Sequence, residues 1–219
     1  MIDELAQLVP FWHDLTKTQQ AFLAGRSRTT SCHAGDHVQG AGYGCAGVVF
    51  VKTGRLRAFM ISEQGREVTL FHVGEHECCV LAASCILPMI TFDIALDAAS
   101  DAELLIMDSQ AFGMVSQENI HAEAFTYRQA TERFSDCMWV MQQVLFMGLD
   151  TRLAIWLLDE VAHTGNPHIE ATHDEIARHL GSAREAVSRM LKYFAREGYV
   201  ALSRGSVDVI DGKRLRSLT

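Results

Sequence analysis

Two short amphipathic segments joined at a single glycine lie between residues 172 and 197, and no other feature restricts the fold of this chain so strongly. Thr172-His-Asp-Glu175 is a capping box, in which the threonine hydroxyl and the glutamate carboxylate each bind an unpaired amide at a helix start. Ser182-Ala-Arg-Glu185 is a second capping box, and Gly181 before it supplies a tight turn. The sequence therefore predicts a helix-turn-helix.

The second predicted helix, residues 182–197, has one apolar and one polar face. The spacing i, i+3, i+4, i+7 predicts that its core-facing side chains are Val187, Met190, Leu191 and Phe194. On the polar face, arginine can bond guanine O6 and N7, and glutamate can accept from cytosine N4. The candidate DNA contacts on this face and at the two caps are Arg184, Glu185, Ser188, Arg189, Lys192, Thr172 and Ser182. Residues 199–204 and 207–210 predict a two-stranded wing.

Charge is distributed unevenly along the chain. The 219 residues have a net charge of −8, yet residues 172–219 hold 9 Lys and Arg against 6 Asp and Glu. Residues 1–171 hold 10 Lys and Arg against 21 Asp and Glu. A basic segment on an acidic protein is expected where that segment alone meets a polyanion.

Residues 28–107 are rich in β-branched and aromatic side chains, and glycine recurs there about every ten residues, as in antiparallel sandwiches and barrels. We expect a hairpin of two strands, 47–54 and 55–61, with Gly54 free to take a positive φ. Further strands are predicted at residues 68–72 and 102–107. This part of the chain therefore predicts an antiparallel β-roll or jelly roll.

A heptad seam runs from Ile120 to Leu145, where mostly apolar positions alternate in steps of four and three. A seam of about three and a half heptads is typical of a helix that pairs with its copy. The alternative is a long helix that faces the core of its own domain. The expected dimer contacts are Tyr127, Phe134, Met138 and Met141. A further amphipathic helix is predicted at residues 150–162.

The chain is long enough for one medium and one small domain. The predicted parts are an effector domain of residues 1–110, a dimerisation helix of residues 111–147 and a DNA-binding domain of residues 148–219. No apolar window reaches the length of about eighteen residues typical of a membrane span, and the N-terminus is acidic. We therefore expect a cytoplasmic protein.

Residues 172–211 resemble the winged helix-turn-helix of the CRP/FNR family of bacterial transcription regulators, and Ala183-Arg-Glu-Ala-Val-Ser-Arg-Met-Leu191 is similar to that family's recognition helix. Weaker similarity to the family's cyclic-nucleotide-binding-like β-roll lies in Ser31-Cys-His-Ala-Gly-Asp36, Thr53-Gly-Arg55, Gly65-Arg-Glu-Val-Thr-Leu70 and Gly74-Glu75. The resemblance implies an α+β fold, in which an antiparallel β-roll, a long dimerisation helix and a winged helix-turn-helix follow one another.

The resemblance also implies a function. Arg184, Glu185 and Arg189 match the family's base-reading residues, which implies a DNA palindrome with TGTGA-like half-sites. It implies a homodimeric activator or repressor that is not an enzyme, has RNA polymerase as a protein partner and responds to an effector or redox signal at the β-roll.

Cyclic AMP is not the expected signal, because residues 78–93 contain no arginine to oppose a buried phosphodiester. Where the family's cyclic-AMP-binding members place hydroxyl groups on the dimer helix, this chain has Cys137 and Met138. The candidate effector or redox residues are Cys45, Cys78, Cys79, Cys85 and Cys137. Thiolates can ligate an iron–sulfur cluster or haem iron or act as redox switches, whereas buried cysteines are also small apolar side chains. Metal, thiol redox chemistry, an organic ligand and no effector at the cysteines stay open as alternatives.

The alternative function, from a different class, is that of a cupin-like jelly-roll metalloenzyme with a DNA-binding appendage. It is suggested by the ten histidines of the chain. Cupins group two histidines as His-x-His ahead of a glutamate. Here three residues separate His33 from His37 and His72 from His76, so the cupin pattern is missed. The regulator is therefore the main expectation.

Overall fold

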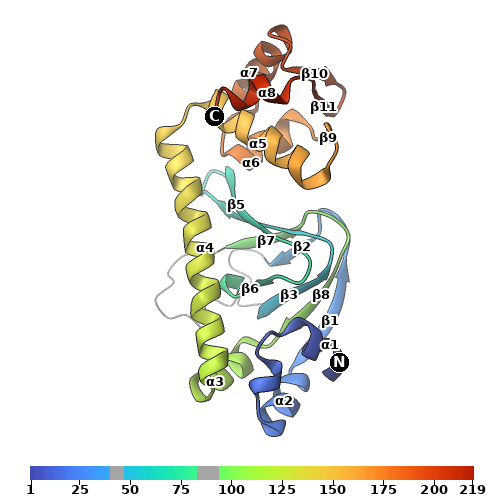
Figure 1. Cartoon of the computed structure of the whole chain (residues 1–219), viewed down its shortest axis with the longest axis vertical. Helices are drawn as coiled ribbons and strands as arrows, with labels where there is room; N and C mark the ends of the chain where they lie inside the picture. The colour runs from blue at the N-terminus through green and yellow to red at the C-terminus, as the bar shows by residue number, and fades with distance from the viewer. Residues whose placement is uncertain (40–46, 83–93) are drawn as a thin grey trace. The chain divides into compact units, whose positions relative to one another are not determined.

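The computed structural model describes residues 1–39, 47–82 and 94–219 (Figure 1). Cys45 and Cys85, two of the predicted effector residues, lie outside the described residues. Among the described helices, none combines the length and the apolar composition that crossing a membrane requires.

The chain packs as two compact units, which we describe separately. The first unit comprises Met1–Met60 and Leu70–Cys137, and the second comprises Ile61–Thr69 and Met138–Thr219. The sequence-based division into three parts concerns function and stays a prediction.

Two four-stranded antiparallel sheets build the β-rich part of the chain, which confirms the predicted β-roll. The first sheet has the order β1 (Ser27–Cys32), β8 (Ala102–Met107), β3 (Val48–Thr53) and β6 (Cys78–Cys79). The second has the order β2 (His37–Gln39), β7 (Ala95–Ala98), β4 (Leu56–Ile61) and β5 (Glu67–Val73). The strand predicted at residues 102–107 is therefore found with its predicted bounds, and β5 extends the predicted strand 68–72 at both ends.

The expected hairpin around Gly54 is wrong, because β3 and β4 belong to different sheets. Gly54 does have a positive φ, of 84°. A Cβ atom at Gly54 would lie 2.2 Å from the carbonyl oxygen of Asp101, just before β8. The turn at Gly54 leads from one sheet to the other and packs closely against the segment at Asp101. Only glycine fits at this position.

Both faces of β3 are covered, because its first four residues are all buried and do not alternate with exposed ones. Phe50 of β3 lies parallel to Phe125, with ring centroids 6.5 Å apart. The ring of Phe11 also packs on Phe125, with a distance of 5.1 Å between ring centroids. The helices of the first unit are α1 (Ile2–Leu8), η1 (Trp12–Asp14), α2 (Lys17–Ala24), α3 (Ser109–Glu118) and α4 (Ile120–Phe146), the last of which continues into the second unit.

The 27-residue helix α4 confirms the long helix predicted from the heptad seam. Its seam is exposed, since Tyr127 and Phe134 keep 61% and 64% of their surface. The opposite side is buried at Ala122, Thr126 and Arg133. The alternative in which the seam faces the core of its own domain is therefore wrong.

The second unit has one apolar core, formed by residues such as Leu157, Val187, Leu191 and Phe194. Its helices, besides the end of α4, are α5 (Leu149–Thr164), α6 (His173–Leu180), α7 (Arg184–Arg196) and α8 (Gly212–Arg216). Its three-stranded sheet has the order β10 (Val200–Ser203), β11 (Ser206–Val209) and β9 (His168–Glu170). The wing was predicted with two strands because β9 and α8 are too short to show a periodic pattern.

Candidate functional site

The first helix of the predicted helix-turn-helix begins at its capping box. The Thr172 hydroxyl accepts from the Glu175 amide at 3.2 Å, and the Glu175 carboxylate accepts from the Thr172 amide at 2.7 Å. The backbone hydrogen bond from Thr172 lowers the pKa of Glu175, so the carboxylate is charged at the positive end of the helix dipole. Gly181 ends α6 in the left-handed conformation, with φ of 60°.

The capping box at Thr172 makes a measurable contribution to stability. We expect Thr172→Ala to lower the free energy of unfolding by about 1 kcal/mol, because one amide of α6 loses its acceptor. Thr172→Ser keeps the hydroxyl, so its free energy of unfolding should stay within about 0.3 kcal/mol of the wild-type value. Urea unfolding followed by circular dichroism measures both variants. Equal losses in the two variants would contradict a role for the hydroxyl.

The second predicted capping box does not form. α7 begins one residue later than expected, with Ala183 as its N-cap and no side-chain cap. The amide of Ser182 instead donates to the carbonyl oxygen of Ala177 at 3.0 Å, which closes the end of α6. Because the Ser182 amide closes α6, it is not available to the Glu185 carboxylate, as a capping box at Ser182 would require.

The two faces of α7 are divided as the sequence predicts. Val187, Leu191 and Phe194 are buried, although Met190 is only half-buried. The predicted contact residues on the other face comprise one half-buried side chain, Ser188, and four exposed ones, Arg184, Glu185, Arg189 and Lys192. The structure thus brings these five residues together on one helix face.

His173, the first residue of α6, lies close to the positive charges of α7. Burial lowers the pKa of His173, and the nearby charges of Arg184 and Lys192 lower it further. The ring is therefore neutral at neutral pH, because burial and the positive potential of these two residues both disfavour its protonated form. Such a potential attracts the phosphates of a nucleic acid.

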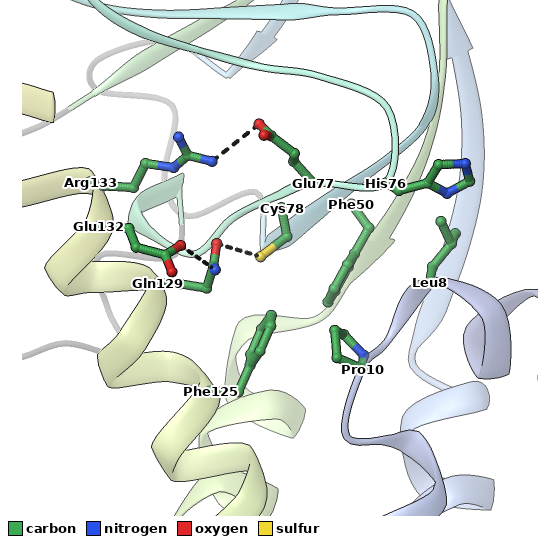
Figure 2. Close-up of a pocket in the computed structure, with 10 residues that line it drawn as sticks. All are labelled: Leu8, Pro10, Phe50, His76, Glu77, Cys78, Phe125, Gln129, Glu132 and Arg133. Atoms are coloured by element: carbon green, nitrogen blue, oxygen red, sulfur yellow. Dashed lines mark hydrogen bonds and ion pairs between the residues drawn. The ribbon is translucent and has the colours of Figure 1, made fainter.

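A pocket of about 150 Å³ lies in the first unit beside α4, and we call it the α4 pocket (Figure 2). Its apolar side is formed by Leu8, Pro10, Phe50 and Phe125. Its polar side is formed by His76, Glu77, Cys78, Gln129, Glu132 and Arg133. Figure 2 shows Gln129, Glu132 and Arg133 projecting from α4, with Phe125 lower on the same helix.

Arg133 is the buried cation of the α4 pocket, with 9% of its surface exposed. Its Nη2 donates to Glu77 at 3.3 Å, and its Nη1 donates to Asp136 at 3.1 Å. Burial acts to lower the pKa of Arg133, but these two carboxylates outweigh burial and raise it. The third donor, Nε, is buried and has no hydrogen-bond partner among the described residues.

A short hydrogen-bond chain links the other polar side chains of the α4 pocket. The Cys78 thiol donates to Oε1 of Gln129 at 3.4 Å, and Nε2 of Gln129 donates to Glu132 at 2.7 Å. Glu132 is exposed and forms no ion pair with any residue that the structure describes. It is therefore a carboxylate at the rim of the pocket with no cation opposite it.

Of the five predicted effector cysteines, the structure describes three. Cys78 and Cys79 are buried in β6, and Cys137 is half-buried on α4. Burial raises the pKa of all three thiols, to about 11 for Cys79. Across the described residues, no group of three or more His, Cys, Asp or Glu side chains is placed to hold a metal ion.

Sequence reasoning missed most of the α4 pocket. The heptad pattern indicates only the seam of α4. The pocket residues of this helix lie outside the seam, and they are Phe125, Gln129, Glu132 and Arg133. The spacing of Ala122, Thr126, Gln129 and Arg133 by four, three and four was the signal that a second side of the helix meets the protein interior.

The comparisons with known proteins identify relatives of both units. The Crp-like helix-turn-helix domain family matches residues 151–218. A CRP/FNR-family transcriptional regulator from Eubacterium rectale has a crystal structure with 36% identity and a TM-score of 0.93, and the match covers 96% of this chain and 98% of that one.

Two further relatives match over a shorter segment or at lower identity. The transcriptional regulator SdrP of Thermus thermophilus is 38% identical over 76 residues, which is 32% of this chain and only 38% of that protein. TTHA1359, a CRP/FNR-family regulator from the same species, matches in structure with a TM-score of 0.67, 22% identity, and coverage of 87% of this chain and 97% of that one. At that identity the likeness shows the fold alone.

Proposed function

This chain belongs to the CRP/FNR family of transcriptional regulators, and we propose that it acts as a homodimer whose affinity for a DNA palindrome is set by a signal at its β-rich unit. It is a DNA-binding regulator rather than an enzyme, as its relatives are. The cupin-like metalloenzyme therefore has no support from the relatives. RNA polymerase is the protein partner that we infer for the DNA-bound dimer.

The observation that carries the DNA-binding proposal is the exposed face of α7. Arg184, Glu185 and Arg189 project from this face while the opposite face is fixed in the core. A helix held in this way can enter the major groove with its first turns against base edges. We propose that these three residues read a TGTGA-like half-site and that Lys192, Ser188, Thr172 and Ser182 contact the backbone or flanking bases.

The proposed dimer is supported by the exposed seam of α4. Large apolar side chains that remain exposed in a row mark a surface that another molecule covers. The seam residues concerned are Tyr127, Phe134, Met138 and Met141. A second copy of the same seam fits because heptad spacing is self-complementary in a two-stranded coiled coil. A homodimer in turn fits a palindrome with two half-sites.

For the signal, we propose an organic ligand rather than a metal or a thiol switch. Cys78 and Cys79 stay protonated at neutral pH because burial raises their pKa, and protonated thiols are poor ligands and poor nucleophiles. Cyclic AMP has no support either, since residues 78–93 contain no arginine. The α4 pocket, which links β6 to the dimer helix, is the place that we propose for the ligand.

A DNA titration tests the proposed function. Fluorescence anisotropy of a labelled palindrome with two TGTGA half-sites should show tighter binding than that of a scrambled duplex of the same length. The logarithm of the association constant should fall linearly with the logarithm of the salt concentration, since phosphate contacts release counterions. Equal affinity for both duplexes at every salt concentration would contradict sequence-specific binding.

A further inference from the structure

We propose that the α4 pocket binds a small aromatic amine with one ring, an ammonium group and a neighbouring hydroxyl. This inference rests on the proposed function, because it names the chemical class of the signal. It is carried by three properties of the pocket: its size and apolar side, its surplus of negative charge, and the buried donor of Arg133 that no described residue satisfies.

The apolar side of the pocket fits a single ring. A cavity of about 150 Å³ lined by apolar side chains can hold a molecule of the size of benzene. The α4 pocket has this volume. Phe125 is half-buried and lies parallel to the buried Phe50, so the accessible aromatic surface on this side of the pocket belongs to Phe125. Leu8 and Pro10 complete this side of the pocket.

The charge of the pocket favours a cation. Arg133 is already paired with two carboxylates, Glu77 and Asp136, so it has no positive charge left for an anion. Glu132 adds a further negative charge without a cationic partner among the described residues. Residues 40–46 and 83–93 contain no Lys, Arg or His, so these segments cannot supply one. An ammonium group at the exposed rim would pair with Glu132, whereas a carboxylate there would be repelled by Glu132.

The hydroxyl group is inferred from Arg133. Its Nε is buried beside the pocket without an acceptor among the described residues, and a buried donor left unpaired costs free energy. A hydroxyl oxygen on the ligand would accept this hydrogen bond without adding negative charge. The class of ligand that satisfies all three properties is therefore an aromatic amino alcohol.

Four probes of nearly equal size separate these contributions by isothermal titration of the full chain. Phenylethanolamine carries both polar groups, phenethylamine lacks the hydroxyl, the phenylethyl alcohol 1-phenylethanol keeps the hydroxyl but lacks the charge, and phenylacetate reverses the charge. We expect affinity to fall in that order, with phenylethyl alcohol about tenfold weaker than phenylethanolamine and phenylacetate without binding. Stronger binding of phenylacetate than of phenylethanolamine, or no binding by any probe, would overturn the proposal.

Variants locate the binding to the α4 pocket. Glu132→Gln removes the charge but keeps an acceptor for Gln129, and it should weaken phenylethanolamine about tenfold while leaving phenylethyl alcohol unchanged. Glu123→Gln removes an exposed carboxylate from the same helix outside the pocket and should change neither. Equal effects of the two substitutions would place the amine elsewhere and overturn the assignment.

These titrations contain no DNA, so the two proposals can fail separately. If phenylethanolamine binds but the palindrome is not preferred over the scrambled duplex, the proposed function fails and the ligand assignment stands. If the palindrome is preferred but no amine binds, only the ligand assignment fails.

Discussion

Phe134→Asp is expected to convert the dimer into folded monomers. In the single chain Phe134 is exposed on the seam, so aspartate there is solvated and the fold should persist. In a dimer that covers the seam, each copy would place an unpaired charge in an apolar interface, at a cost of about 3–5 kcal/mol. Such a cost weakens association more than about a hundredfold. Sedimentation velocity across a concentration series measures the effect.

The control for this variant is Phe134→Leu, which keeps an apolar side chain at the same seam position. It should remain dimeric at concentrations where Phe134→Asp is monomeric, and both variants should keep the helical content of wild type by circular dichroism. A folded Phe134→Asp protein that sediments as a dimer at all concentrations would show that the seam is not the interface.

Arg184→Ala and Lys192→Ala should weaken DNA binding in different ways. Both side chains are exposed on α7, but Arg184 lies in its first turn, where a recognition helix meets base edges. We expect Arg184→Ala to lose about 1–3 kcal/mol on the preferred palindrome and much less on a scrambled one. Lys192→Ala should weaken both duplexes about equally and reduce the salt dependence by about one phosphate contact.

The comparison of the two variants on the two duplexes decides between base reading and simple charge attraction. If Arg184→Ala lost the same free energy on both duplexes, Arg184 would act only through its charge. The same titrations with Glu185→Gln show whether the carboxylate discriminates between bases, since this substitution preserves the length of the side chain.

The parts of the fold that follow from local pattern could be predicted from the sequence. The seam predicted α4, and the first capping box with Gly181 predicted α6 and its end. The second capping box failed because the Ser182 amide donates to the Ala177 carbonyl oxygen instead of the Glu185 carboxylate, and only the folded turn decides between these two acceptors. The hairpin at Gly54 failed for a related reason: whether a turn pairs two strands or separates them depends on the distant segment at Asp101.

The exposed face of α7 could be predicted because its five candidate residues lie on one helix, and their contacts with DNA stay a prediction. The α4 pocket could not, since it joins residues from the N-terminal segment, β3, the start of β6 and α4. The cysteines drew attention because of their spacing, yet Cys78 is only one of several side chains at this site. Glu132 and Arg133 are unremarkable in the sequence and gain their roles only from burial and from their partners.

If the α4 pocket binds a ligand and the seam binds a second copy of the chain, as we propose, both sites lie on α4 and their binding equilibria can be linked. Gln129 and Arg133 face the pocket while Tyr127 and Phe134 lie on the seam, and all belong to one unbroken helix about 40 Å long. If occupation of the pocket tightens dimerisation by some factor, dimerisation must tighten ligand binding by the same factor. The apparent affinity for the ligand would then rise with the concentration of the protein itself. A cell that changed the abundance of this regulator would thereby change the concentration of ligand to which it responds.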